Sequence, residues 1–284
     1  MNLKSFKPVL TLICALGALN LAAQINPPII DVNSGESYNY QIDIKTSSTQ
    51  TMGGMQQSSE ADQRVKVLFE VDKITENDEI NLTATISDLS LSMNAMGMMD
   101  TTITTPGKFG PAYFASFDKF GKSIDRYPID SVEKDPNNQF DFENASVTIT
   151  LFLELPENKI TEGEEWTMDN VDTVKSGPFS ELIIRSVGTF VLDGIKTIDG
   201  VEVYKISSAE VIELIGTGDM NGMQISAEGE GANEGFYYVN TKNGVIEKRE
   251  SLLELSMIIA ISGQQSMTIP MVQKVNYSQV LISE

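Results

Sequence analysis

Residues 193–261 read DGIKTIDGVEVYKISSAEVIELIGTGDMNGMQISAEGEGANEGFYYVNTKNGVIEKRESLLELSMIIAI, and this stretch decides the fold. It contains long extended runs separated by tight turns at Asp199-Gly200, Met220-Asn221-Gly222-Met223 and Thr241-Lys242-Asn243-Gly244. Asn-Gly between two extended runs favours the left-handed backbone angles of a type I′ hairpin turn. The stretch therefore predicts a meander of antiparallel strands, and it argues against a nucleotide-binding fold or a helical bundle.

An earlier part of the chain repeats short turn motifs of the second half in the same order. Val71-Asp72-Lys73-Ile74 aligns with Leu192-Asp193-Gly194-Ile195, and 193 − 72 gives a separation of 121 residues. Gly35-Glu36-Ser37-Tyr38 likewise precedes Gly163-Glu164-Glu165-Trp166 at a similar spacing. Matches in one order at similar spacings predict an internal duplication. We expect residues 24–284 to form one all-β unit built of two repeats, approximately 34–155 and 156–284.

Period-two alternation of apolar and polar residues marks further strands. It runs through residues 38–45, 64–71, 80–93 and 145–155. Residues 109–117 are rich in aromatic side chains and could form a short helix or an aromatic strand that leads to the turn at Lys119–Lys122. We expect a short helix or an irregular loop there. The predicted fold is an all-β antiparallel meander of long strands in two related halves, with at most one or two short helices. It would form a curved sheet, a half-barrel or a sandwich.

The first 23 residues have the pattern of a signal peptide. Lys4 and Lys7 precede an apolar run from Val9 to Leu21, and small residues at Ala22 and Ala23 suit cleavage before Gln24. The run is short for a hydrocarbon core about 30 Å thick. We therefore expect an exported protein, periplasmic or extracellular, with no transmembrane segment in the mature chain.

The composition excludes several kinds of chemistry. The chain has no histidine, and its one cysteine, Cys14, lies inside the predicted signal peptide. Thiolate zinc sites, disulfides and the usual Ser-His-Asp or Cys-His nucleophiles are therefore excluded from the mature chain. Removing Lys4 and Lys7 leaves 18 basic against 40 acidic residues, and 18 − 40 gives −22. Such a charge disfavours nucleic acid as a partner. We expect no enzymatic activity, no catalytic residues, no cofactor and no resident metal.

Methionines flank two of the predicted hairpin turns. Met52 and Met55, like Met220 and Met223, are placed to face each other across a two-residue turn. The candidate interaction tips are Met52, Met55, Met93, Met96, Met220 and Met223. Thioethers in such pairs would suit Cu(I), a soft ion. Methionine also fills cores and covers apolar surface, and this second interpretation stays open.

The Gly-Glu-x-aromatic openings, the Asp-Gly turn after Leu192, the glycines between Gly229 and Gly235 and the turn at Asn240–Gly244 carry a family resemblance. Over most of residues 34–256 the chain resembles an uncharacterised family of exported all-β proteins of the Gram-negative bacterial envelope. The resemblance implies two related halves, and the chain departs from lipid-anchored members because it has no lipobox cysteine. The expected function is non-enzymatic binding of an apolar ligand or an envelope protein. The alternative is a structural or adhesive surface module, and a carboxylate-based hydrolase is a weaker one.

Overall fold

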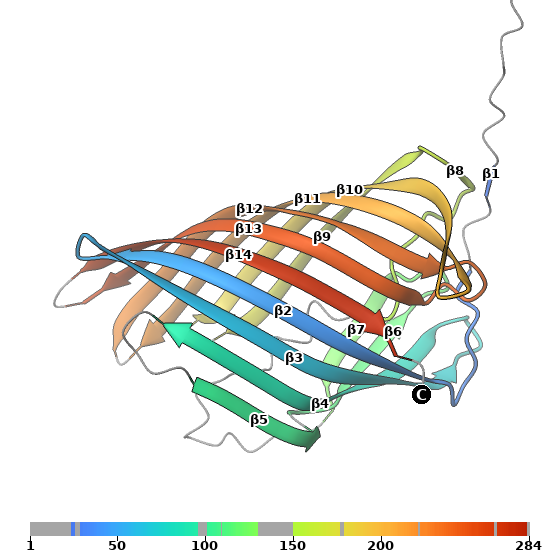
Figure 1. Cartoon of the computed structure of the whole chain (residues 1–284), viewed down its shortest axis with the longest axis horizontal. Coiled ribbons are helices and arrows are strands. Elements are labelled where there is room, and N and C mark those ends of the chain that lie inside the picture. Colours follow the sequence, from blue (N-terminus) through green and yellow to red (C-terminus); the bar gives the residue numbers. More distant parts are fainter. Residues whose placement is uncertain are drawn as a thin grey trace, which may run out of the picture.

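The computed structural model describes residues 24–25, 29–95, 101–108, 110–129, 150–176, 179–220, 222–263 and 266–282. Within them the protein is all-β, and an antiparallel meander forms one curved, unclosed sheet of 12 strands (Figure 1). The strands are β1 (Gln24–Ile25), β2 (Ser37–Met52), β3 (Met55–Ile74), β4 (Ile80–Ala95), β5 (Thr101–Lys108), β6 (Tyr113–Phe117), β7 (Ser123–Pro128), β8 (Ile160–Thr161), β9 (Glu165–Ser176), β10 (Phe179–Ile198), β11 (Val201–Met220), β12 (Met223–Asn240), β13 (Ile246–Ser262) and β14 (Met267–Leu281). Across the sheet their order is β7-β6-β4-β3-β2-β14-β13-β12-β11-β10-β9, while β5 pairs with β4 and β1 pairs with β8.

Tight hairpins connect most neighbouring strands. Gly53 and Gly54 both have positive φ, 58° and 83°, which is the geometry of the type I′ turn. Because consecutive hairpins of a meander alternate between its two ends, the β2–β3, β4–β5, β9–β10, β11–β12 and β13–β14 hairpins lie at one end. We call this the tip end. The opposite end holds the β3–β4, β10–β11 and β12–β13 connections, and we call it the closed end.

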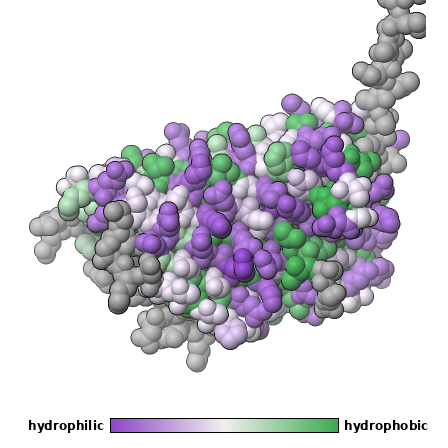
Figure 2. Space-filling view, in the orientation of Figure 1, coloured by the Kyte–Doolittle hydropathy of each residue, from purple (hydrophilic) through white to green (hydrophobic). Residues whose placement is uncertain are grey.

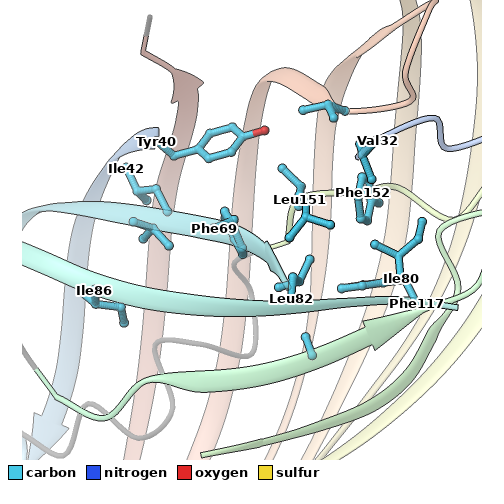
Figure 3. Packing of buried hydrophobic residues seen from close by; sticks show 14 of the residues in the cluster. Val32, Tyr40, Ile42, Phe69, Ile80, Leu82, Ile86, Phe117, Leu151 and Phe152 are labelled. Carbon is cyan, nitrogen blue, oxygen red and sulfur yellow. The ribbon is translucent and has the colours of Figure 1, made fainter. Parts of the chain in front are cut away.

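The core lies on the inner face of the sheet, toward the closed end. On β2, Tyr40 and Ile42 are fully buried, while the alternate residues point to the outer face. Residues 150–155 cross inside the curve: Leu151 and Phe152 pack against β2, β3, β4 and β6 (Figure 3), while Leu153 and Leu155 pack against β10, β11 and β12. This segment therefore joins the two sides of the curved sheet at its closed end.

The two Gly-Glu openings have the same backbone geometry. The N–H of Gly35 donates to the carbonyl oxygen of Val71 at 2.8 Å, and the N–H of Gly163 donates to that of Leu192 at 2.8 Å. Both glycines have positive φ, and a register shift follows both Val71 and Leu192. These equivalent contacts support the duplication that the spacing predicts, which stays a proposal for the chain as a whole.

Glycines on β12 permit close contact with β13. A Cβ atom added at Gly231 would lie 2.5 Å from the carbonyl oxygen of Glu254, and one added at Gly229 would lie 2.8 Å from the Cβ of Met257. No side chain fits at such distances without a shift of the backbone. Glycine at these inward positions therefore permits the close approach of β13 to β12.

Two local expectations were wrong. Residues 113–117, expected as a short helix or loop, form strand β6. Tyr113, Ala115 and Phe117 face the core, while Phe114 on the other face stacks on Tyr127, so aromatic side chains lie on both faces of β6 and the alternation is lost. Residues 150–155 are not a strand: Phe152 makes one isolated bridge to Val245, and residues 145–149 lie outside the described residues. No helix among the described residues has the length and apolar content to cross a membrane.

Candidate ligand site on the inner face

The burial of apolar side chains on the inner face changes along the strands, from the closed end to the tip end. Beyond the packed core, several apolar side chains on this face are only half-buried. We call them the inner apolar patch: Leu182, Ile184, Ile212, Leu214, Met257, Ile259 and Met271. The register places Ile184, Leu214, Gly229, Met257 and Met271 opposite one another across β10 to β14. Several strands therefore contribute one continuous apolar surface that the described residues do not fully cover.

A polar cluster lies between the packed core and this patch. The guanidinium of Arg249 on β13 lies 4.9 Å from the ring centre of Tyr237 and 4.9 Å from that of Tyr277. The positive charge is thus held between two aromatic faces, an arrangement that favours a cation in a poorly solvated place. Two strands away, Glu210 accepts a 2.8 Å hydrogen bond from the side-chain amide of Asn233. We call these five residues and Ser208 the Arg249 cluster.

Burial and charge act together on the pKa values of the cluster. Burial raises the pKa of Tyr277 to about 12, against a smaller opposing effect of Arg249. Burial also raises the pKa of Tyr237. Burial alone would lower the pKa of Arg249, but Tyr237, Tyr277 and Glu210 outweigh it and the pKa is raised. At neutral pH the cluster therefore holds a charged arginine between two neutral phenols.

The Oγ of Ser208 and the Nε1 of Trp166 are buried polar atoms on the inner face that have no hydrogen-bond partner within the described parts of the chain. Trp166 stacks on Phe190 at 5.8 Å between ring centres, and Phe190 lies 6.1 Å from Tyr237. An aromatic series therefore leads from the edge strand β9 to Arg249. Buried polar groups are normally paired, so these two atoms suit a ligand that reaches the cluster.

The predicted methionine pairs form as hairpin geometry requires, but their role as interaction tips stays a prediction. Met52 pairs directly with Met55, and Met220 with Met223. Met55 is 68% exposed, whereas Met52 and Met223 are half-buried. Met93, which is 37% exposed, pairs with Ala61 and Thr101, and Met96 lies outside the described residues. The tip end thus carries methionines on separate hairpins.

Sequence reasoning missed the Arg249 cluster, although a signal was present. Arg249 falls in phase with Leu253, Leu255 and Met257, which point inward. Glu210 likewise falls in phase with Ile206 and Ile212 on β11. A charge at the apolar phase of a strand is unusual and marks a buried polar site. Among the described residues, no three Asp, Glu, Cys or His side chains are grouped to hold a metal.

A second concave region is a shallow trench of about 860 Å³ across the outer face. Val191, Phe236 and Leu252 form its apolar part, and Glu165, Glu234 and Glu250 give it an acidic character. Nearby charges are already paired: the Nζ of Lys205 lies 2.9 Å from Asp193 and 4.1 Å from the ring centre of Phe236, and Lys248 lies 3.0 Å from Glu250. The face seen in Figure 2 is largely hydrophilic with smaller hydrophobic patches. The inner face is therefore the stronger candidate.

Comparison with known proteins assigns no family. No protein-family model and no curated protein matches the chain. Among solved structures the chain is similar to an outer membrane channel from Pseudomonas putida F1, with 7% identity over 89% of this chain and 98% of that one and a TM-score of 0.29. OccK7 (OpdD) and OccK5 (OpdH) of Pseudomonas aeruginosa have 6% and 10% identity, cover 88% and 87% of this chain and 100% and 99% of their own, and score 0.23 and 0.22. TM-scores this low do not establish a shared fold.

Proposed function

We propose that the protein is an exported, non-enzymatic binding protein of the bacterial envelope that holds an apolar ligand on its inner face. The observation that carries the proposal is the inner apolar patch, in which side chains from several neighbouring strands stay half-buried beside a fully packed core. Apolar surface left open to water is unfavourable by roughly 25 cal/mol per Å². A ligand with an apolar chain would remove that surface from water.

The single tryptophan makes the proposal measurable. Trp166 faces the inner side next to Phe190, and it is the only tryptophan of the chain. A stearate brominated near the middle of its chain should quench the fluorescence of Trp166 in a saturable way. Unlabelled stearate should reverse the quenching by competition.

Adjacent residues on opposite faces supply a matched pair of variants. Leu214 belongs to the inner apolar patch, and its neighbour Ile215 is exposed on the outer face. Leu214→Asp should weaken binding about tenfold or more, because it places a charge where the chain would lie, and Ile215→Asp should leave binding unchanged. Saturable quenching that both variants weaken equally would contradict an inner-face site. Absence of any saturable quenching would contradict apolar-ligand binding itself.

The hairpin tips are a second candidate site, favoured by the exposure of Met55 and Met93. Methionine side chains are flexible and adapt to partners of varied shape. In this role the tips would contact an envelope protein, and the tip end would be an interaction surface. Chemical cross-linking from a cysteine introduced at Gln56, an exposed neighbour of Met55, would capture such a partner. Capture of the same protein from a cysteine at the closed end, such as Asn77→Cys, would contradict the assignment to the tips.

A further inference from the structure

The Arg249 cluster brings opposite charges to one end of the inner apolar patch. Arg249 lies between Tyr237 and Tyr277, and the negative charge of Glu210 is near enough to raise the pKa of Arg249. Glu210 is held in place by the hydrogen bond from Asn233. Both charged residues point inward, since each occupies the same phase of its strand as buried apolar residues. The inner face thus offers an apolar surface that ends near one positive and one negative group.

From this arrangement we infer that the ligand is a single-chain amphiphile with a zwitterionic head group, such as a lysophospholipid carrying phosphate and ammonium groups. This inference rests on the proposed function. The acyl chain lies on the inner apolar patch, the phosphate meets Arg249, and the ammonium group meets Glu210. A head group with only a negative charge would gain from Arg249 but be repelled by Glu210, whereas a zwitterion gains from both.

The hydroxyl of Ser208 also suits a polar head group at this place. Ser208 is 6% exposed, and its Oγ has no partner within the described residues. It faces inward two residues before Glu210 and directly opposite Gly235, which has no side chain. A phosphate or glycerol oxygen of the ligand could therefore accept a hydrogen bond from the hydroxyl of Ser208.

The chain also provides a matched pair of control charges on the outer face, because Arg185 and Glu213 lie opposite each other on β10 and β11 and are exposed.

The test compares brominated single-chain lipids of one chain length by quenching of Trp166. The probes are lysophosphatidylethanolamine, which is zwitterionic, lysophosphatidylglycerol, which is anionic, and monoacylglycerol, which is neutral. The wild-type protein should bind the zwitterion about tenfold more tightly than either of the others, since each charge-assisted contact is worth roughly that factor. Glu210→Gln should strengthen binding of the anionic probe about tenfold. Arg249→Met should abolish the preference for the zwitterion over monoacylglycerol, while Arg185→Met and Glu213→Gln should change nothing.

The outcomes separate the head-group inference from the proposed apolar-ligand function. If the wild-type protein binds all three probes with equal affinity, the head-group inference is overturned and the apolar-ligand function stands. If none of the probes binds but brominated stearate does, only the head-group inference is overturned; if stearate does not bind either, the proposed function itself fails. Circular dichroism would show whether Arg249→Met folds, and if it does not, the wild-type ranking and Glu210→Gln decide the question. If Glu210→Gln leaves the preference for the zwitterionic over the anionic probe unchanged, the inference of a zwitterionic head group is also overturned.

Discussion

The hydroxyl of Tyr40 on β2 donates a 2.5 Å hydrogen bond to the carbonyl oxygen of Ile246 on β13, and the two residues are separated by 206 positions in sequence. Tyr40 is fully buried and its ring meets that of Phe69 edge to face at 5.6 Å. One side chain thus links the first long strand of the sheet to a strand of the second half. The closed end depends on such long-range contacts rather than on local ones.

Tyr40→Phe should lower the free energy of unfolding by about 1–3 kcal/mol. The ring packing would remain, but the carbonyl oxygen of Ile246 would lose a buried donor, and a buried unsatisfied acceptor carries that penalty. Urea unfolding followed by circular dichroism measures the change. Tyr127→Phe is the matched control, since Tyr127 is exposed. Equal stability of the two variants would show that the Tyr40 hydroxyl contributes nothing to the fold.

Gly231→Ala should destabilise the protein by about 1–3 kcal/mol or more. The added Cβ would approach the carbonyl oxygen of Glu254 at 2.5 Å, so β12 and β13 would have to move apart. Ala232→Ser, on the exposed neighbouring position, should stay within about 0.5 kcal/mol of the wild type. The melting temperatures of the two variants provide the comparison. A Gly231→Ala protein as stable as the wild type would rule out the close strand approach.

Much of the sheet could be predicted from the sequence, because half-buried strands show their alternation and type I′ turns show their glycines. Ser37–Met52, with Tyr40 and Ile42 inside and Gln41 and Asp43 outside, is such a case. Strand β6 is the alternative and not the expected interpretation, because Phe114, which stacks on Tyr127, is aromatic at a position where an alternating strand would have a polar residue. The joining of two core clusters by residues 150–155 depends on tertiary contacts that no local pattern encodes.

The candidate site was harder to predict than the fold. The methionine pairs follow from turn chemistry alone, whereas the Arg249 cluster requires the register of β11, β12, β13 and β14. Only that register brings Glu210, Asn233, Arg249 and Tyr277 to one place on one face. Strand register depends on the whole hydrophobic pattern, since a one-residue slip would send every side chain to the other face.

Stability should fall as the pH rises from about 10 to about 12. A tyrosine in an unfolded chain has a pKa near 10, and burial raises the pKa of Tyr277 to about 12 in the folded protein. Between these values the folded protein keeps a proton that the unfolded chain has lost, so the stabilisation is fully present below about pH 10 and is lost above it. Buried Tyr40 and Tyr237 shift in the same direction. The contribution of Tyr277 is about 2–3 kcal/mol.

Urea unfolding at a series of alkaline pH values would test this dependence. Tyr277→Phe should reduce the slope of stability against pH, and Tyr127→Phe, at an exposed position, should leave the slope as it is in the wild type. Lysines titrate in the same range in every variant, so the difference between the two variants isolates Tyr277. Identical slopes would mean that Tyr277 is not protected from solvent in the folded protein.

Met55→Thr should change the free energy of unfolding by less than about 0.5 kcal/mol, because Met55 is 68% exposed at the β2–β3 tip. Ile225→Ala is the matched control at the same end of the sheet: Ile225 is buried on the inner face, and its truncation should cost about 2–5 kcal/mol. Urea unfolding of both variants measures the contrast. A loss at Met55 as large as that at Ile225 would mean that the tip packs onto the body of the molecule and is no contact surface.

If Met55 is free, replacing Met52, Met55, Met220 and Met223 together by Thr should weaken binding of Cu(I) or of a captured partner. Unchanged binding in a folded variant would remove the tips as an interaction site.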